Sequence, residues 1–295
     1  MSVSHPERDP SQERRTVAFV GLGAMGTAMA GCLLRHGQLV RGFDVRPQPV
    51  QALAALGGQA CRSSAEAADG ADAAIVIVLN ADQVEQAVFG RDGLAESLAS
   101  GTPVVSMSTM SPGRAQALAA RAAERGLRWL DAPVSGGIER ARDGSLTTMV
   151  GGASDDLTRV RPMLEAFSRD IFHLGPVGSG STAKMVNQVL VFCNLAAAAE
   201  AMTLCRKLGA DQQAVYEVIK TAVGTSAVFE TRVPKLIDGS YSTGGSLRIA
   251  LKDLGILEDT AREVGMPMLM TAQATQLFRA TAAGCWRATT WAWRG

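Results

Sequence analysis

Residues 16–30 of the chain read TVAFVGLGAMGTAMA, and this stretch decides the fold. It opens with a short run of apolar and β-branched residues, which predicts a buried strand. Glycines at positions 21, 23 and 26 follow at once and lead into a helix-length stretch. In a G-x-G-x-x-G turn, the first glycine permits a tight turn and the second lets the backbone approach a pyrophosphate. The third lets the helix pack closely on the strand. We therefore expect a dinucleotide-binding turn here.

Later strand ends add candidate cofactor contacts. Asp44 ends the next predicted strand, where a carboxylate accepts hydrogen bonds from the adenosine ribose hydroxyls. Its charge favours NAD over NADP, although Arg41 or Arg46 beside it could instead accept a 2′-phosphate. Asn80 and Thr109 follow two further strands, with turn capping as the alternative role. The cofactor residues that we expect are Gly21, Leu22, Gly23, Ala24, Met25, Gly26, Asp44, Asn80 and Thr109.

The chain changes character near residue 177. Before it, short apolar runs at 16–23, 39–44, 73–80, 102–109 and 127–135 predict strands, and the stretches 24–37, 81–89 and 112–126 predict helices. This alternation predicts right-handed βαβ units and a doubly wound parallel sheet. After it, strand signals nearly stop, and helices are expected near 182–208, 211–221, 226–237, 246–264 and 267–283. The fold class is thus α/β, an N-terminal Rossmann sheet followed by an all-α C-terminal domain.

A length of 295 residues suits two domains. We place a disordered tail at residues 1–14, an NAD(P)-binding Rossmann domain at 15–177, and a helical substrate and oligomerisation domain at 178–295. Three tryptophans crowd into 285–295, and back-translation of this atypical end permits another reading frame. We therefore consider a frameshift in the gene, which resequencing would test.

The composition argues against several classes of function. A net charge of +1 argues against nucleic acid or an acidic membrane as the main partner. Apolar runs such as AAIVIVL are too short to span a bilayer. Five cysteines without a CxxC pair and only three histidines give no expectation of a metal site. The absence of an apolar leader and this cysteine usage favour the cytoplasm.

Two further segments carry chemistry. In DAPVSGG (131–137), Ser135, Gly136 and Gly137 offer a hydroxyl and approachable N–H groups that suit a small carboxylate. In GSGSTAKMVNQ (178–188), Lys184 stands near the start of a long, mostly apolar helix, and Asn187 shares its face three residues later. A solvent-exposed first turn is the alternative interpretation of this lysine.

Four motifs in order complete a pattern: GLGAMGTAMA, DAPVSGG continued by IERARDGSL, GSGSTAKMVNQ, and LKDLGILEDTA. Over residues 16–284 the chain resembles the β-hydroxyacid dehydrogenase family, which includes 3-hydroxyisobutyrate dehydrogenase and tartronate semialdehyde reductase. The resemblance implies that Lys184 is the catalytic lysine, Asn187 its neighbour at the substrate, and residues 135–137 the site of the substrate carboxylate. It also implies that Lys252 approaches the cofactor and that Asp253 is structural.

By this resemblance the reaction is hydride transfer between a nicotinamide and a small hydroxy acid, with Lys184 as general acid/base. A free lysine has a pKa of about 10.4, and acid–base work near neutral pH needs a lower one. Desolvation and the like charge of Lys252 would lower it.

Two segments, 76–90 and 223–232, most resemble L-threonate dehydrogenases, so L-threonate is the expected substrate, and Thr225, Ser226 and Phe229 are expected beside it. The alternatives are 3-hydroxyisobutyrate and tartronate semialdehyde. Lys184 argues against an imine reductase, and a catalytically silent NAD(P)-binding scaffold or sensor is the alternative of another class. The resemblance implies a homodimer or homotetramer.

Overall fold

The computed structural model describes residues 14–240 and 246–284. The expected N-terminal tail, apart from Arg14, and the atypical end at 285–295 lie outside these residues. The chain forms two compact units, residues 1–184 and 185–295. Each unit is described by itself.

The first unit is built on a parallel six-stranded sheet in the order β3-β2-β1-β4-β5-β6. The strands are β1 (Thr16–Val20), β2 (Leu39–Phe43), β3 (Gln59–Ala60), β4 (Ala73–Val76), β5 (Pro103–Ser106) and β6 (Arg128–Asp131). The order reverses beside β1, which is the arrangement of a doubly wound Rossmann sheet. The predicted fold class is confirmed, and only the two-residue β3 was absent from the expectation.

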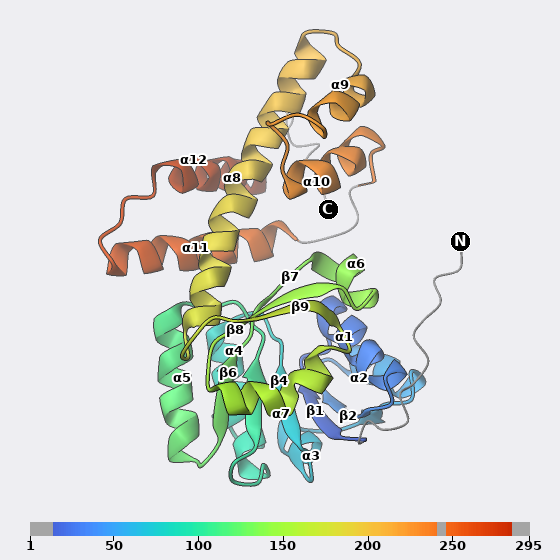
Figure 1. The fold of residues 1–295 in the computed structure, drawn as a ribbon, viewed down its shortest axis with the longest axis vertical. Coiled ribbons are helices and arrows are strands. Elements are labelled where there is room, and N and C mark those ends of the chain that lie inside the picture. The colour runs from blue at the N-terminus through green and yellow to red at the C-terminus, as the bar shows by residue number, and fades with distance from the viewer. Residues whose placement is uncertain (1–13, 241–245, 285–295) are drawn as a thin grey trace. The chain divides into compact units, whose positions relative to one another are not determined.

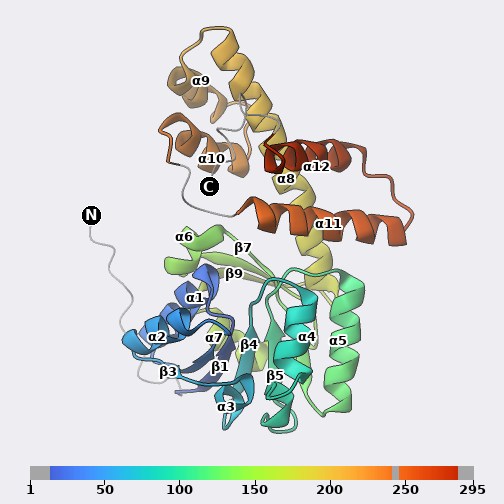
Figure 2. The same cartoon turned by 180° about the vertical axis from the view of Figure 1, so that it is seen from behind.

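Helices cover both faces of this sheet because the strands are apolar on both faces. In β1, Val17 and Phe19 point to one core and Ala18 and Val20 to the other, with the alternation expected of a strand. The first core contains residues of α1 (Ala24–Arg35), α2 (Pro47–Ala55), α6 (Gly137–Arg142) and α7 (Ser154–Leu164). The second contains residues of α3 (Ser64–Ala68), α4 (Ala81–Phe89), η1 (Leu94–Glu96) and α5 (Pro112–Glu124). Figure 1 shows α7 in front of the sheet, and Figure 2 shows α4 in front of it.

A second, smaller sheet corrects one prediction. Residues 127–135 were expected to form one strand, but they form β6 and then β7 (Val134–Ser135), which belong to different sheets. Pro133 stands at the break, where its missing N–H cannot continue a ladder. β7 pairs antiparallel with β8 (Leu146–Val150), and β8 pairs parallel with β9 (Ser168–His173). The last two strands were not expected from the sequence.

The second unit is all-helical, as predicted. Its long helix α8 (Ser179–Lys207) begins in the first unit and runs through the second. The others are α9 (Gln212–Ile219), α10 (Ala227–Ile237), α11 (Leu247–Glu263) and α12 (Leu269–Ala282). One core joins α8 to α9 and α10, and another joins it to α11 and α12, where the rings of Phe192 and Phe278 meet edge to face at 5.4 Å. The helices lie along α8 in these two pairs (Figure 1).

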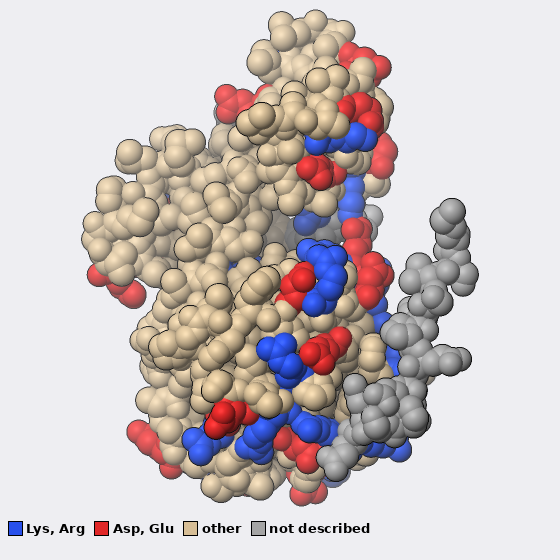
Figure 3. Space-filling view, in the orientation of Figure 1, with Lys and Arg blue, Asp and Glu red and all other residues tan. Residues whose placement is uncertain are grey.

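Among the described residues, α8 is the one helix long and apolar enough to cross a membrane. Its side chains instead enter both of these cores, which is the role of a central helix in a helical domain. On the first unit, Figure 3 shows positive and negative side chains interspersed over the visible face, in keeping with the net charge of +1.

Candidate active site

The glycine turn after β1 divides into two structural glycines and one open one. Gly21 has φ of +96°, and a Cβ there would lie 2.1 Å from the carbonyl oxygen of Ile77. A Cβ on Gly26 would lie 1.9 Å from the carbonyl oxygen of Gly21. At Gly23, by contrast, the nearest atom would be a guanidinium nitrogen of Arg46 at 3.8 Å. The space over Gly23 is therefore left for something other than the protein.

That space belongs to an open cavity of about 360 Å³ at the start of α1. The residues that line it are Leu22, Gly23, Ala24, Thr27, Arg46, Gln48, Pro49 and Ala52. Among the residues that the structure describes, no side chain caps α1 at Gly23. An uncapped helix start presents N–H groups and the positive end of the helix dipole, which together bind phosphate. The start of α1 at Gly23 is thus suited to bind the pyrophosphate of a dinucleotide.

Asp44 follows β2 at the edge of this turn. Its Oδ2 accepts the N–H of Leu22 at 2.9 Å, which ties the carboxylate to the glycine turn. Its Oδ1 accepts the N–H and the Nε of Arg46, at 2.9 and 3.0 Å. Burial raises the pKa of this carboxyl, but the bonds from Arg46 and Leu22 outweigh it and hold the pKa below its ordinary value. The carboxylate is thus ionised at neutral pH, which suits ribose hydroxyls as donors.

The two arginines considered for a 2′-phosphate lie differently. Arg46 is half exposed, lines the cavity and pairs with Asp44. Arg41 instead donates to the main-chain oxygens of Glu66 and Asp69 at 2.6 and 2.8 Å, at the end of α3. Arg46 is therefore the arginine that could meet a 2′-phosphate.

The remaining cofactor candidates of the first unit stand at later strand ends. Asn80 is the N-cap of α4, since its Oδ1 accepts the N–H of Gln83 at 2.9 Å. This is the capping role considered as its alternative. Thr109 is partly buried in the segment between β5 and α5. Neither side chain is among the residues lining the cavity at Gly23.

Lys184 is not a solvent-exposed lysine. It stands in the second turn of α8, it is 8 % exposed, and its Nζ donates to the carbonyl oxygen of Val134 at 2.8 Å. Val134 directly precedes Ser135, so the fold brings the lysine to the DAPVSGG segment, far away in the sequence. A buried amine beside a small polar loop is a suitable arrangement for proton transfer.

Ser135 closes β7, and Gly136 and Gly137 turn the chain into α6. Both glycines have positive φ, +137° and +73°. A Cβ on Gly137 would meet no atom within 4 Å, whereas one on Gly136 would meet the side chain of Arg140 at 2.9 Å. Gly136 thus shapes the turn, and Gly137 faces open space.

In the second unit, four polar side chains form a chain of contacts. The amide of Asn187 donates to Gln188 at 2.9 Å, and Gln188 donates to Oδ2 of Asp253 at 2.5 Å. Asp253 is buried, and its other oxygen lies 2.7 Å from the ammonium of Lys252. Two residues expected in the site, Asn187 and Lys252, are thus linked through Gln188, which the sequence did not single out.

The pocket residues expected around the start of α10, Thr225, Ser226 and Phe229, have partners within the helical unit. Ser226 caps α10 by accepting the N–H of Phe229 at 3.1 Å. The Phe229 ring is buried and stacks on Tyr216 at 5.8 Å. Thr225 donates to the carboxylate of Glu230 at 3.0 Å. These contacts explain their positions by local packing.

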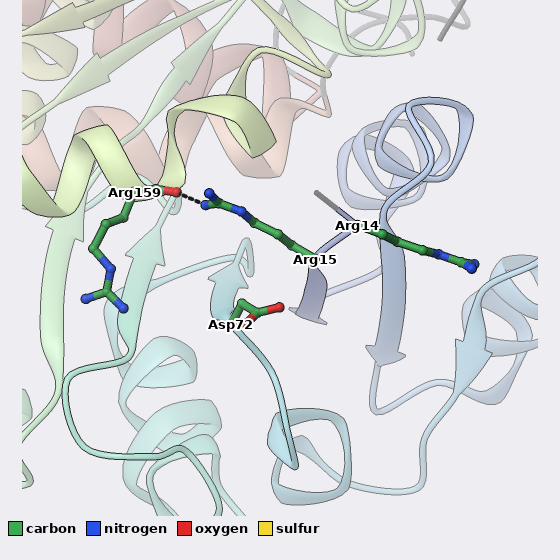
Figure 4. A pocket seen from close by; sticks show the side chains of 4 residues that line it. All are labelled: Arg14, Arg15, Asp72 and Arg159. Carbon is green, nitrogen blue, oxygen red and sulfur yellow. Dashed lines mark hydrogen bonds between the residues drawn. The ribbon is translucent and has the colours of Figure 1, made fainter. Parts of the chain in front are cut away.

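A second cavity, of about 470 Å³, lies at the amino ends of β1 and β4 and is lined by Arg14, Arg15, Asp72 and Arg159. The guanidinium of Arg15 donates to the main-chain oxygen of Arg159, and that of Arg159 donates to Gly101 at 2.9 Å. Figure 4 shows the three arginine side chains pointing in different directions. These groups tie chain segments together and do not converge on an anion.

Comparison with known proteins agrees with this geometry. Residues 16–175 match the family model described as the NAD binding domain of 6-phosphogluconate dehydrogenase. Residues 178–289 match the one described as NAD-binding of NADP-dependent 3-hydroxyisobutyrate dehydrogenase.

Individual relatives match nearly the whole chain. An L-threonate dehydrogenase of Cupriavidus necator is 41% identical over 90% of this chain and 89% of its own. A 2-(hydroxymethyl)glutarate dehydrogenase of Eubacterium barkeri is 38% identical over 89% and 87%. The crystal structure of a 3-hydroxyisobutyrate dehydrogenase from Salmonella typhimurium superposes with a TM-score of 0.84 at 36% identity, covering 94% of this chain and 98% of that one.

The uncapped glycine turn, the acidic residue after β2 and these matches define a nicotinamide-dependent oxidoreductase. The chain belongs to the β-hydroxyacid dehydrogenase family, in the group related to 3-hydroxyisobutyrate dehydrogenase. It is an NAD-binding hydroxyacid dehydrogenase that acts on a small molecule, and NADP remains an alternative cofactor.

Proposed function

We propose that the chain is an NAD-dependent L-threonate dehydrogenase in which Lys184 is the general acid/base. The observation that carries the chemistry is the buried Lys184 amine on the carbonyl oxygen next to Ser135. The substrate rests on the L-threonate dehydrogenase that is 41% identical over 90% of the chain. NAD rests on the ionised Asp44 beside the glycine turn.

The bound nicotinamide supplies the hydride acceptor. In the oxidation, Lys184 in its uncharged form takes the proton of the substrate hydroxyl, and in the reduction its ammonium returns that proton. Asn187 lies one turn further along α8 on the same face, where its amide would hydrogen-bond the reacting hydroxyl. The N–H groups and hydroxyl of residues 135–137 would hold the substrate carboxylate, and Lys252 would contact the cofactor.

The test is NADH formation by the purified protein with L-threonate, D-threonate, 3-hydroxyisobutyrate and glycerate, and NADH consumption with tartronate semialdehyde. The proposal predicts the largest kcat/KM for L-threonate. A higher value for 3-hydroxyisobutyrate or tartronate semialdehyde would keep the chemistry and replace the substrate. No turnover of any compound, with NADH bound normally, would instead support a silent cofactor-binding scaffold or sensor.

Lys184→Ala should abolish turnover and leave NADH binding intact. Lys207→Ala is the matched control, since Lys207 is an exposed lysine at the other end of the same helix. Equal activity of the two variants would contradict the role of Lys184.

We also propose that the chain assembles as a homodimer or homotetramer in the cytoplasm. Val186, Leu190 and Leu204 fall on one stripe of α8 and are 58–59% exposed in the single chain. Large exposed apolar side chains in a row suit an interface between copies. Light scattering after size exclusion should give a multiple of 30.8 kDa, and a monomer at micromolar concentration would contradict the assembly.

A further inference from the structure

Asp131 is a buried carboxylate at the carboxyl end of β6, and it is 1 % exposed. Its Oδ1 accepts the N–H of Gly178 at 2.7 Å, and its Oδ2 accepts the N–H of Ser181, also at 2.7 Å. Both donors belong to the start of α8. Both of these hydrogen bonds come from backbone N–H groups and lower the pKa of this carboxyl, but burial outweighs them and raises the pKa above its ordinary value. Asp131 thus binds the first turn of the helix that carries Lys184.

The main chain around the contact between Asp131 and α8 is closely packed, and two glycines make this possible. A Cβ on Gly180 would lie 2.3 Å from the carbonyl oxygen of Met149 and 2.5 Å from that of Asp131. A Cβ on Gly151 would lie 2.5 Å from Oδ1 of Asp131 itself. Gly180 therefore lets the helix start lie close to the main chain at Met149 and Asp131, and Gly151 leaves room for the carboxylate. The start of α8 thus lies close to the main chain at Asp131, and the Asp131 carboxylate accepts its N–H groups.

One loop holds the helix at two points. The Asp131 carboxylate binds the N–H groups at the helix start. Three positions later, the main-chain oxygen of Val134 accepts a hydrogen bond from Nζ of Lys184. Lys184 stands three positions after Ser181, so the two attachments have the same spacing on both segments. A shift of the helix start would therefore move the lysine relative to Ser135.

We propose that Asp131 is a positioning residue for the reaction: by capping α8 it sets where the Lys184 amine lies beside Ser135. This inference rests on the proposed role of Lys184. Asp131 does not touch the reacting atoms. A carboxylate suits the task because it accepts two N–H groups at once and its charge opposes the positive end of the helix dipole.

The test compares Asp131→Asn with Asp156→Asn in the same unit. Asp156 is also a buried carboxylate in the first turn of a helix, but that helix is α7, which does not carry the lysine. An asparagine keeps the shape at either position and removes the charge and one acceptor. Thermal unfolding, kcat and KM are measured for both, together with competitive acetylation of Lys184 against pH, read by mass spectrometry.

The proposal predicts that Asp131→Asn lowers kcat at least tenfold, keeps the KM for the cofactor within twofold, and moves the pH midpoint of Lys184 acetylation. Asp156→Asn should lower the melting temperature without moving either readout. The proposal is overturned if Asp131→Asn leaves both the midpoint and kcat unchanged. Equal losses of kcat in the two variants at equal melting temperatures would also overturn it, because they would show a merely structural role.

Acetylation needs no substrate, so it separates this inference from the proposed function. A moved midpoint in a protein that oxidises no hydroxy acid would support the positioning and contradict the chemistry. Hydrogen exchange in the wild-type protein covers the case of a variant that does not fold. The amides of Gly178 and Ser181 should exchange at least a hundredfold more slowly than free peptide amides, and exchange at the free rate would overturn the proposal.

Discussion

Two aspartates of the Rossmann unit, Asp44 and Asp131, both accept backbone N–H but have different surroundings. Asp44 directly follows β2 and Asp131 is the last residue of β6, and each accepts backbone N–H from a glycine-rich segment. Asp44 is hydrogen-bonded to two residues that line an open cavity, Leu22 and the half-exposed Arg46. Asp131 is enclosed, and both of its oxygens are used by the start of α8. The same residue type thus stands next to a cavity at one strand end and holds the start of a helix at the other.

The glycines beside Asp44 test this difference with the largest expected effect. Gly26→Ala should prevent stable folding of the first unit, because overpacking against a backbone oxygen costs about 3 kcal/mol or more. Gly23→Ala should melt within a few degrees of wild type but lose NADH binding, since its methyl group enters the space over the turn. Circular dichroism melting measures the stability of each variant, and fluorescence titration with NADH measures its cofactor binding. Normal NADH affinity in Gly23→Ala would contradict the cofactor site.

Asp44→Asn is expected to weaken NAD binding by about 10- to 100-fold, since a hydrogen bond to a charged group contributes about 1.5–3 kcal/mol. The reason is that the amide cannot accept from two ribose hydroxyls and the Leu22 N–H together. Isothermal titration measures the dissociation constant, with Asp69→Asn as an exposed control. An unchanged constant would place the ribose elsewhere.

Arg46→Ala should change the preference of the enzyme between NAD and NADP. Arg46 is the cation at the cavity, so its loss should weaken NADP by about tenfold, the size of a charge-assisted hydrogen bond, and leave NAD nearly unchanged. The ratio of kcat/KM for the two cofactors reports it. Arg41→Ala is the control, because that guanidinium is held at α3. A parallel loss for both cofactors would contradict this role.

The smallest expected effect is on the pH dependence of NAD binding. The pKa of Asp44 lies below its ordinary value, so its ionised form, and the affinity that depends on it, persists above that value and declines only as the pH falls through the lowered pKa. In Arg46→Ala the decline should begin at a higher pH, because the two hydrogen bonds from the guanidinium to Asp44, at 3.0 and 3.2 Å, are lost while the backbone N–H bond stays. Titrations between pH 3.5 and 7 would show it, and coincident profiles would contradict the assignment.

The sequence predicted the Asp44 site more fully than the surroundings of Asp131, for a physical reason. The glycine turn, the strand before it and the acid after the next strand are local patterns, since their spacing reflects one βαβ unit. The contact from Asp131 to Gly178 joins positions 47 residues apart, and no periodicity encodes it. The signal available in the sequence was an aspartate at the end of a strand and a glycine-rich start to a helix.

Other differences between the predicted and the observed elements also have local physical causes. β7 has only two residues, and β8 and β9 are partly exposed, so their sequences lack the continuous apolar run that revealed the central strands. The break between β6 and β7 falls at Pro133, and this proline was a signal present in the sequence. Lys184 illustrates the converse: its place beside Ser135 came from the resemblance and agrees with the contact to Val134, whereas its helix alone left an exposed lysine equally reasonable.

The most direct test of the account is chemical rescue of Lys184→Ala. The variant should bind NADH as wild type does and lose about 10²- to 10⁴-fold in kcat with the preferred hydroxy acid, the usual contribution of a general acid/base. Added primary amines should restore part of this rate in proportion to their concentration, and should not affect Lys207→Ala. A Lys184→Ala variant that keeps more than about a tenth of the wild-type kcat without added amine would contradict the central claim, because proton transfer would then pass through another group.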